Sequence, residues 1–510
     1  MKIETRPADT GAPVVTTVPG EPPRATARKQ FDAASLTAIG ALMAYVVIAL
    51  LGVGGQAMVL TFPIGCLLVG LLTYVRSPST YVTFTFWVWL LTPFIRRLFD
   101  LRYGFHPTSP LLLAPLLVSA ITVITVMRRR LLLRSSSYLP FVVAFAALSY
   151  AYFIGIIRQS FASASYDLLT WFAPLLFGLH IALEWRQFPN LKTTVQSCAL
   201  WGLLVTATYG IIQWVQPPVW DRVWVVSAEM FSIGSPSPYV IRVFSTLNAP
   251  GPFSVMLVFA LLIGLVAPQR WRAVPLALGI VALILTKGRS AWAAFFLGAL
   301  VLQLRQPLRS LPRQWLVLLG VVLLAAPLLS QPKVLSLISR RAGTVANLQT
   351  DRSYQSRIDL TRYALSRMAV NPAGAGLGGL GGASKLLTNT KSAVAFDSGP
   401  LEVYAIMGWL GGTLFMMALF AIALSAVRSR GNRDQAVTGA VAAVVALFIT
   451  CLFGNIFTGA SGFFFWSAVG LATSGRTYSL AVDLVNRYAS IPGLPGYVAA
   501  AAARPAITAA

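Results

Sequence analysis

Apolar runs of about 20 residues recur along almost the whole chain, separated by short polar junctions. A hydrocarbon core about 30 Å thick needs about 20 apolar residues per helix, so each run is long enough to cross a bilayer. Hydrophobic residues make up 56% of the 510 residues and charged residues only 11%, against about 25% in soluble proteins. The pattern predicts an all-α polytopic membrane protein with about 12–14 transmembrane helices. The candidate spans are 35–54, 57–75, 79–95, 109–127, 137–157, 166–183, 193–214, 249–267, 271–287, 290–304, 315–331, 399–427, 436–456 and 460–475.

The two ends of the chain and one long segment near residue 350 lack such runs. Residues 1–30 are rich in Pro, Thr and Ala and contain no hydrophobic stretch of the kind that a cleavable signal needs. The predicted organisation is a disordered cytoplasmic tail at 1–30, a membrane domain of about eleven spans at 31–331, a periplasmic loop with an interfacial helix at 332–398, the last three spans at 399–475, and a cytoplasmic tail at 476–510.

The distribution of Lys and Arg indicates the orientation, because short cytoplasmic loops of membrane proteins are enriched in both. If the N-terminus is cytoplasmic, every short loop that falls inside is basic, and shifting the count by one span would break this agreement. The residues concerned are Arg76, Arg128, Arg129, Arg130, Arg134, Arg186, Lys192, Arg270, Arg272, Arg305, Arg309, Arg313, Arg428, Arg430 and Arg433. We therefore expect both termini in the cytoplasm. The net charge of +25 is dispersed between apolar runs, which favours membrane lipids rather than nucleic acid as partners.

The segment 332–398 is basic although it is predicted to lie outside. It carries nine Lys and Arg residues against three Asp residues. Long loops cross the membrane regardless of charge, so the predicted topology stands. The excess charge favours an anionic ligand, with lipid headgroups of the outer leaflet as the alternative. The sequence of residues 353–369 predicts a helix that lies parallel to the membrane surface and would hold Arg357 and Arg362 in fixed places.

Two short motifs lie at the predicted outer face. The sequence TKGRS at 286–290 separates two apolar runs with two cations, Lys287 and Arg289. Charges in so short a junction are usually functional, although both side chains could instead extend to lipid headgroups. The sequence GAGLGG at 374–379 matches G-x-G-x-x-G, but no strand–helix unit surrounds it, which excludes a dinucleotide site. Its glycines either let backbone N–H groups approach a phosphate or let the chain turn beneath the membrane surface.

Four segments together resemble the O-antigen ligase and polymerase superfamily. They are RVFSTLNAPGPF at 242–253, TKGRSAWAAFFLGALV at 286–301, RIDLTRYALSRMAVNPAGAGLGG at 357–379 and FDSGPLEVYAIMGWLGGTLF at 396–415. The resemblance covers roughly residues 190–475, with the motifs in the same order as in the family.

This resemblance implies a membrane glycosyltransferase of the C-type fold. Such enzymes transfer an oligosaccharide from undecaprenyl pyrophosphate to an acceptor at the outer face of the inner membrane, without nucleotide sugar, metal or other cofactor. By position, Arg242, Arg289 and Arg357 match arginines of the family. Ligases of the family commonly carry a His-Asn pair where this chain has Asp397-Ser398.

The chemistry of such a transfer suits the basic residues. Negative charge develops on the departing pyrophosphate, and without a metal it must be stabilised by fixed cations through charge-assisted hydrogen bonds. We expect Arg242, Lys287, Arg289, Arg357 and Arg362 to bind the pyrophosphate, with Arg289 taking part in catalysis.

The acceptor hydroxyl needs a base or an orienting acceptor, and a carboxylate can serve. Asp397 and Glu402 are the two candidates, at the outer end of the span that begins at 399. Alternative roles remain open for both residues. Asp397 could cap that helix, and Glu402 could hydrogen-bond to a neighbouring helix.

We expect a polysaccharide polymerase that joins undecaprenyl-pyrophosphate-linked repeat units at the periplasmic face of the bacterial inner membrane. A ligase that delivers glycan to lipid A core or protein is the alternative within the enzyme class. A flippase or transporter is the alternative outside it, although no internal repeat supports that class. A flippase and a chain-length regulator are the protein partners expected of a polymerase.

Overall fold

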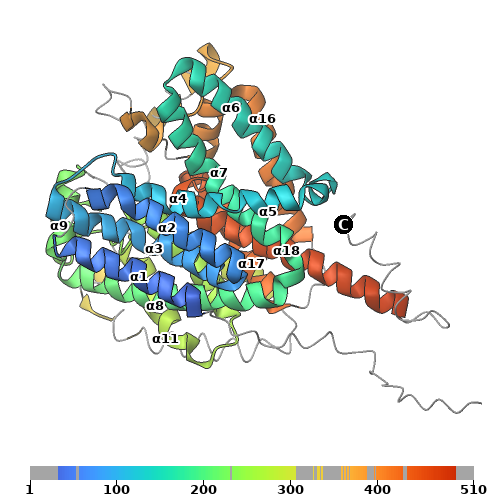
Figure 1. The fold of residues 1–510 in the computed structure, drawn as a ribbon, viewed down its shortest axis with the longest axis horizontal. Coiled ribbons are helices and arrows are strands. Elements are labelled where there is room, and N and C mark those ends of the chain that lie inside the picture. The colour runs from blue at the N-terminus through green and yellow to red at the C-terminus, as the bar shows by residue number, and fades with distance from the viewer. Residues whose placement is uncertain are drawn as a thin grey trace, which may run out of the picture.

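The computed structural model describes residues 33–52, 57–229, 233–305, 368–386, 396, 398–428 and 434–489, with short stretches between 326 and 366. All regular secondary structure in these residues is helical (Figure 1). The α-helices are α1 (Ala33–Leu50), α2 (Ala57–Arg76), α3 (Pro78–Tyr103), α4 (Leu113–Ala120), α5 (Val123–Arg128), α6 (Leu139–Arg158), α7 (Phe161–Leu183), α8 (Phe188–Val215), α9 (Val219–Ser227), α10 (Pro250–Leu265), α11 (Ala273–Leu285), α12 (Arg289–Arg305), α16 (Gly399–Arg428), α17 (Gln435–Thr450) and α18 (Gly459–Ala489). Among the short 3₁₀-helices, η8 (Gly381–Leu386) lies nearest to the candidate site.

Polar residues define where several of these helices begin. The side-chain oxygens of Ser77, Ser160 and Asp434 accept hydrogen bonds from backbone N–H groups in the first turns of α3, α7 and α17. Such caps satisfy backbone donors that have no partner inside the helix.

The predicted fold class is confirmed. Thirteen of the fourteen predicted spans coincide with helices, and most of the remaining one, 315–331, lies outside the described residues. Eight helices in the described part of the chain are long and apolar enough to cross a membrane. The others are shorter or more polar: α10 has 16 residues, and α3 includes Arg96, Arg97 and Asp100. The total of about 12–14 spans therefore stays a prediction.

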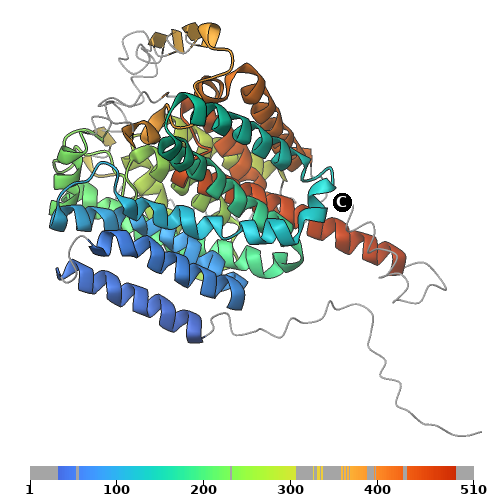
Figure 2. The same ribbon diagram turned by 45° about the horizontal axis from the view of Figure 1, so that its top comes forward.

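The helices pack around α7 and α18, which contact each other along their length. Glycines allow this close approach, as is typical of helix pairs in membranes. A Cβ at Gly178 would overlap the backbone of Trp466, and a Cβ at Gly470 would overlap the backbone of Gly178. Figure 2 shows α1 at the edge of the bundle, where it packs on α2.

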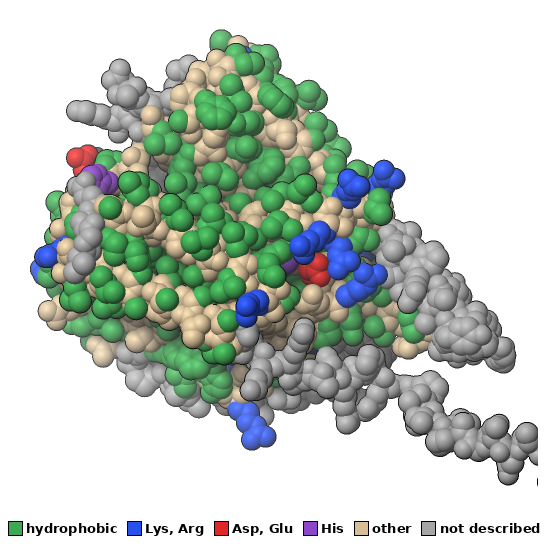
Figure 3. All heavy atoms as spheres, viewed as in Figure 1, with side chains coloured by type: hydrophobic (Ala, Val, Ile, Leu, Met, Phe, Trp, Pro, Cys, Tyr) green, Lys and Arg blue, Asp and Glu red, His purple; other side chains and the backbone are tan. Residues whose placement is uncertain are grey.

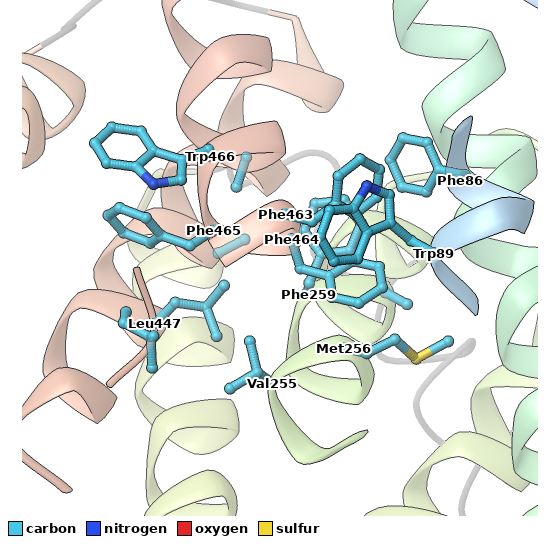
Figure 4. Packing of buried hydrophobic residues seen from close by; sticks show 14 of the residues in the cluster. Phe86, Trp89, Val255, Met256, Phe259, Leu447, Phe463, Phe464, Phe465 and Trp466 are labelled. Carbon is cyan, nitrogen blue, oxygen red and sulfur yellow. The ribbon is translucent and has the colours of Figure 1, made fainter. Parts of the chain in front are cut away.

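Aromatic rings fill the space between α3, α10 and α18 (Figure 4). The ring of Phe463 lies 4.8 Å from that of Phe86 and 5.2 Å from that of Trp89, measured between centroids. Phe259 and Phe464 lie 5.5 Å apart in the same cluster. Offset and edge-to-face ring pairs of this kind add to the stability that burial provides.

Loops that are predicted to lie on the same side of the membrane contact one another. At the predicted outer side, Lys287 bonds to the carbonyl of Val240. At the predicted inner side, Lys192 pairs with Asp434 at 2.5 Å, and Arg129 pairs with Glu184 at 3.4 Å. In Figure 3, hydrophobic side chains cover most of the visible face, and Lys and Arg gather mainly toward the end from which α18 projects. These observations support the alternation of the loops, while the side that faces the cytoplasm stays a prediction.

Single cysteines introduced into two exposed loops test the orientation. We expect Ser235→Cys to react with a membrane-impermeant maleimide in intact spheroplasts, because its loop is predicted to lie outside. Ser136→Cys should react only after lysis. Both serines are exposed, and the native residues Cys66, Cys198 and Cys451 are buried and therefore give little background. Labelling of Ser136→Cys alone in intact spheroplasts would show the opposite orientation.

Candidate active site

A glycine-rich segment, residues 371–379, lies against three helices: α6 and α7, which are distant in sequence, and α16, which follows it. Gly374, Gly376 and Gly378 have φ angles of 85°, 78° and 91°. Residues with a side chain rarely adopt these values, so glycine at alternate positions lets the segment follow its path.

Helix α16 is broken where it meets this segment. At Gly408, φ is 66° and ψ is −171°, which interrupts the hydrogen bonding of the helix. The carbonyl oxygens of Ala405 and Ile406 instead accept hydrogen bonds from the backbone N–H groups of Ala375 and Gly376, at 2.8 and 2.9 Å. The glycine-rich segment thus satisfies polar groups that a broken helix would otherwise leave unpaired.

The same segment bonds to α6 and α7. The backbone N–H of Leu377 donates to the carbonyl of Ala151 at 3.0 Å, and that of Gly378 donates to Asp167 Oδ2 at 2.8 Å. Gly155 makes the approach to α6 possible, because a Cβ there would overlap the carbonyl oxygen of Leu377.

These bonds distinguish between the two roles expected for the glycines. The backbone N–H of Gly374 donates to the carbonyl of Asn371 at 3.1 Å, so every backbone N–H from Gly374 to Gly378 donates to an acceptor within the protein. The structure therefore supports the tight turn, and it does not support a phosphate site made from these N–H groups.

Replacing Gly376 by Ala should lower the stability of the protein. The new Cβ would overlap the backbone of Gly155, and the φ of 78° would be strained for alanine. We expect a loss of about 1–3 kcal/mol, seen as a lower thermal midpoint of the detergent-solubilised protein. Gly382→Ala is the matched control, because Gly382 is exposed and its Cβ would meet nothing within 4 Å. Equal midpoints for the two variants would contradict the packing role.

A cationic turn joins α11 to α12. Lys287 lies in this turn with a φ of 56°, and its Nζ donates to the carbonyl of Val240 at 2.6 Å. Arg242 approaches from the loop before α10, and its Nε donates to the carbonyl of Thr286 at 3.2 Å. Arg289 is the first residue of α12. A non-glycine residue with positive φ is uncommon and is found preferentially at functional sites.

The backbone reinforces this arrangement, since the N–H of Val243 donates to the carbonyl of Leu285 at 3.3 Å. Three of the five predicted pyrophosphate-binding residues, Arg242, Lys287 and Arg289, are thus brought to one junction. Arg289 also lies at the positive end of the α12 dipole, where a cation does not stabilise the helix. A bound anion would stabilise both the helix end and the cations around it.

Glu402 lies in the first half of α16 and is half-buried. Its Oε1 accepts a hydrogen bond from Asn455 Nδ2 at 2.8 Å, and Asn455 Oδ1 in turn accepts one from the backbone of Phe457 at 2.8 Å. The alternative expected for Glu402 was a hydrogen bond to a neighbouring helix; the structure has a hydrogen bond to the loop between α17 and α18 instead, and this bond fixes the orientation of the carboxylate.

The other predicted site residues are described incompletely. Arg357 and Asp397 lie outside the described residues, so their roles stay predictions. Arg362 is helical and exposed. Met368 and Phe396 are buried together, and Leu401 and Tyr404 in the first half of α16 pack against them.

Sequence reasoning missed several polar residues around the site. Asp167 is an acidic residue within the predicted span 166–183, and an ionisable residue inside an apolar run is costly in a membrane. That signal alone would have singled it out. Arg97 and Asp221 form a buried ion pair, but they lie 124 positions apart in the sequence, and neither motif nor spacing connects them.

A cavity of about 330 Å³ opens between the loop before α4, helix α7 and η8. Its lining consists of Pro107, Thr108, Ser109, Pro110, Leu112, Leu113, Ser165, Tyr166, Leu169, Gly382 and Leu386. Tyr166 directly precedes Asp167, and Gly382 and Leu386 belong to η8, which follows the glycine-rich segment in the chain.

Comparison with known families identifies the region that carries most of these residues. Residues 274–416 match the family model described as O-antigen ligase. This region is therefore similar to the O-antigen ligase family. It includes the cationic turn at Lys287 and Arg289, the glycine-rich segment and Glu402, whereas Arg242 lies before it. The family match confirms the resemblance to the O-antigen ligase and polymerase superfamily. No curated protein matches the chain.

Proposed function

We propose that this protein is a polysaccharide polymerase that joins undecaprenyl-pyrophosphate-linked oligosaccharide units at the periplasmic face of the bacterial inner membrane. The observation that carries the proposal is the junction of Arg242, Lys287 and Arg289, which lies at one end of helices belonging to a membrane bundle. The O-antigen ligase match over residues 274–416 supports lipid-linked glycans as substrates.

In the proposed reaction, the hydroxyl oxygen of the acceptor sugar attacks the anomeric carbon of the donor. The bond between that carbon and the pyrophosphate oxygen breaks, and undecaprenyl pyrophosphate leaves with the electron pair. Arg289, with Arg242 and Lys287, stabilises the charge that develops on the leaving group. Glu402 or Asp397 accepts the proton of the attacking hydroxyl, while Arg357 and Arg362 complete the site that binds the pyrophosphate anion.

The match to the O-antigen ligase family is compatible with either a polymerase or a ligase. The absence of the His-Asn pair of the ligases, which is replaced by Asp397-Ser398, favours the polymerase. Because a polymerase consumes one lipid-linked unit at a time, its loss should leave single repeat units on the lipid.

Deletion of the gene, followed by analysis of the lipid-linked glycans, tests this assignment. We expect single repeat units exposed at the periplasmic face, and expression of the intact protein should restore polymer. Accumulation of finished polymer on the lipid would indicate a ligase. Single units confined to the cytoplasmic face would indicate a flippase.

A further inference from the structure

The loop that carries Arg242 is held by an ion pair that has no contact with solvent. Arg97 in α3 and Asp221 in α9 pair at 2.6 Å between Nη1 and Oδ1, and both side chains have 0% exposed surface. Asp221 Oδ2 also accepts hydrogen bonds from Tyr209 at 2.7 Å and from Gln213 at 2.6 Å. The pair therefore joins three helices, α3, α8 and α9, at a single carboxylate.

The ion pair reaches the backbone of the loop at three points. Arg97 Nη2 donates to the carbonyl of Ser245 at 2.6 Å. Gln213, which is bound to Asp221, accepts hydrogen bonds at Oε1 from the backbone N–H groups of Phe244 at 3.0 Å and Ser245 at 2.9 Å. The rings of Phe94 and Phe244 lie 5.6 and 4.9 Å from the guanidinium carbon of Arg97 and enclose it.

The anchored residue has a conformation that needs support. Ser245 has a φ of 53°, which costs free energy in a residue with a side chain. Its hydroxyl donates to the carbonyl of Thr206 in α8 at 2.5 Å, so Ser245 is bound through its backbone and its side chain. Three residues earlier, Arg242 is fixed by its own N–H, which donates to the carbonyl of Ile233 at 3.0 Å.

Helix packing alone does not explain a buried charge pair at this place. The cost of removing both charges from water commonly equals or exceeds their attraction, and apolar residues of similar volume often serve as well. Apolar residues could not, however, bind the carbonyl and N–H groups of a loop in an unfavourable conformation. The planar guanidinium can, because it donates in two directions at once.

We propose that Arg97 and Asp221 are positioning residues, which hold the loop at Phe244 and Ser245 so that Arg242 meets the pyrophosphate of the lipid-linked substrate. This inference rests on the proposed function, since it takes Arg242 as a ligand of the pyrophosphate. The pair acts through Arg242 and does not itself contact the substrate.

The test variant is Arg97→Lys, which keeps a positive charge beside Asp221. A single ammonium cannot reproduce the guanidinium fork that bridges Asp221 and the carbonyl of Ser245. With purified full-length protein in nanodiscs, we expect the Kd for undecaprenyl pyrophosphate to rise about tenfold. Binding of undecaprenol, which lacks the pyrophosphate, should not change.

Arg96→Lys is a matched control on the same helix. Arg96 also bridges a carboxylate and a loop carbonyl, because its Nε donates to Asp100 at 3.2 Å and its Nη2 donates to the carbonyl of His106 at 2.6 Å. It is likewise buried, but its bonds go to the loop after α3 and not to the loop of Arg242. We expect this variant to bind undecaprenyl pyrophosphate as the unaltered protein does.

Combination with Arg242→Ala separates positioning from a general effect on the fold. If Arg97 acts through Arg242, then Arg97→Lys should weaken binding no further once Arg242 is replaced. A full additional loss in that background, or unchanged binding by Arg97→Lys, would overturn the inference. Should Arg97→Lys fail to accumulate, the neutral pair Arg97→Met with Asp221→Leu takes its place, because it leaves no unpaired buried charge.

The same measurements distinguish failure of the inference from failure of the proposed function. If Arg242→Ala weakens binding and Arg97→Lys does not, only the positioning role is refuted. If the unaltered protein binds undecaprenyl pyrophosphate no better than undecaprenol, the proposed pyrophosphate site is refuted, and the positioning role with it.

Discussion

Replacing Arg289 by Ala should abolish chain extension while the protein still inserts and accumulates. Arg289 begins α12 at the junction that also holds Lys287 and Arg242, and we propose that it meets charge that grows as the pyrophosphate leaves. Removing one such donor typically lowers the rate about 100–1000-fold, or about 2.7–4 kcal/mol in barrier. Polymer formed in membranes from a radiolabelled lipid-linked repeat unit measures the loss.

Two further variants test whether the loss of activity is specific to a guanidinium at this end of α12. Arg289→Lys should recover only part of the activity, because an ammonium cannot form the paired hydrogen bonds of a guanidinium. Arg305→Ala removes the same charge from the last residue of α12, at the opposite end, and should remain active. Near-normal polymer from Arg289→Ala would assign this residue to the lipid headgroups and weaken the proposed enzyme function.

Replacing Glu402 by Gln should also stop polymer formation if Glu402 is the base. An amide oxygen can still accept the hydrogen bond that Asn455 Nδ2 donates at 2.8 Å, so the link between the two segments is kept. The basicity is lost, and removal of a general base lowers rates about 100–10,000-fold. If Glu402 serves only as a structural link, Glu402→Gln should retain activity and normal stability.

Asp397→Asn is tested in parallel, because the sequence resemblance predicts Asp397 at the position where ligases carry His. Glu184→Gln is the control, since Glu184 pairs with Arg129 at the predicted inner side. An active Asp397→Asn beside an inactive Glu402→Gln would assign the base to Glu402, and the reverse would assign it to Asp397. Full activity in both would leave neither carboxylate as the base.

The helical spans were predictable because each apolar run must satisfy its backbone within one helix. The cationic junction was predictable too, since charges at Lys287 and Arg289 interrupt apolar sequence. The role of the glycines between 374 and 378 was not predictable from the sequence. It depends on carbonyl groups of α6 and α16 that only the tertiary structure brings close to these glycines. The pairing of Arg97 with Asp221 escaped prediction for the same reason.

The bonds of the glycine-rich segment also constrain the order in which the chain can assemble. The acceptor of the Gly378 N–H, Asp167, is made 211 residues earlier, and Ala151 is made earlier still. During synthesis, the hairpin of α6 and α7 therefore enters the membrane before the segment that completes it exists. Until that segment arrives, the surface of α6 at Gly155 stays uncovered and the carboxylate of Asp167 lacks the backbone donor of Gly378. A carboxylate is costly to bury in lipid, so the Gly378 N–H stabilises the hairpin only once the intervening chain has been translated.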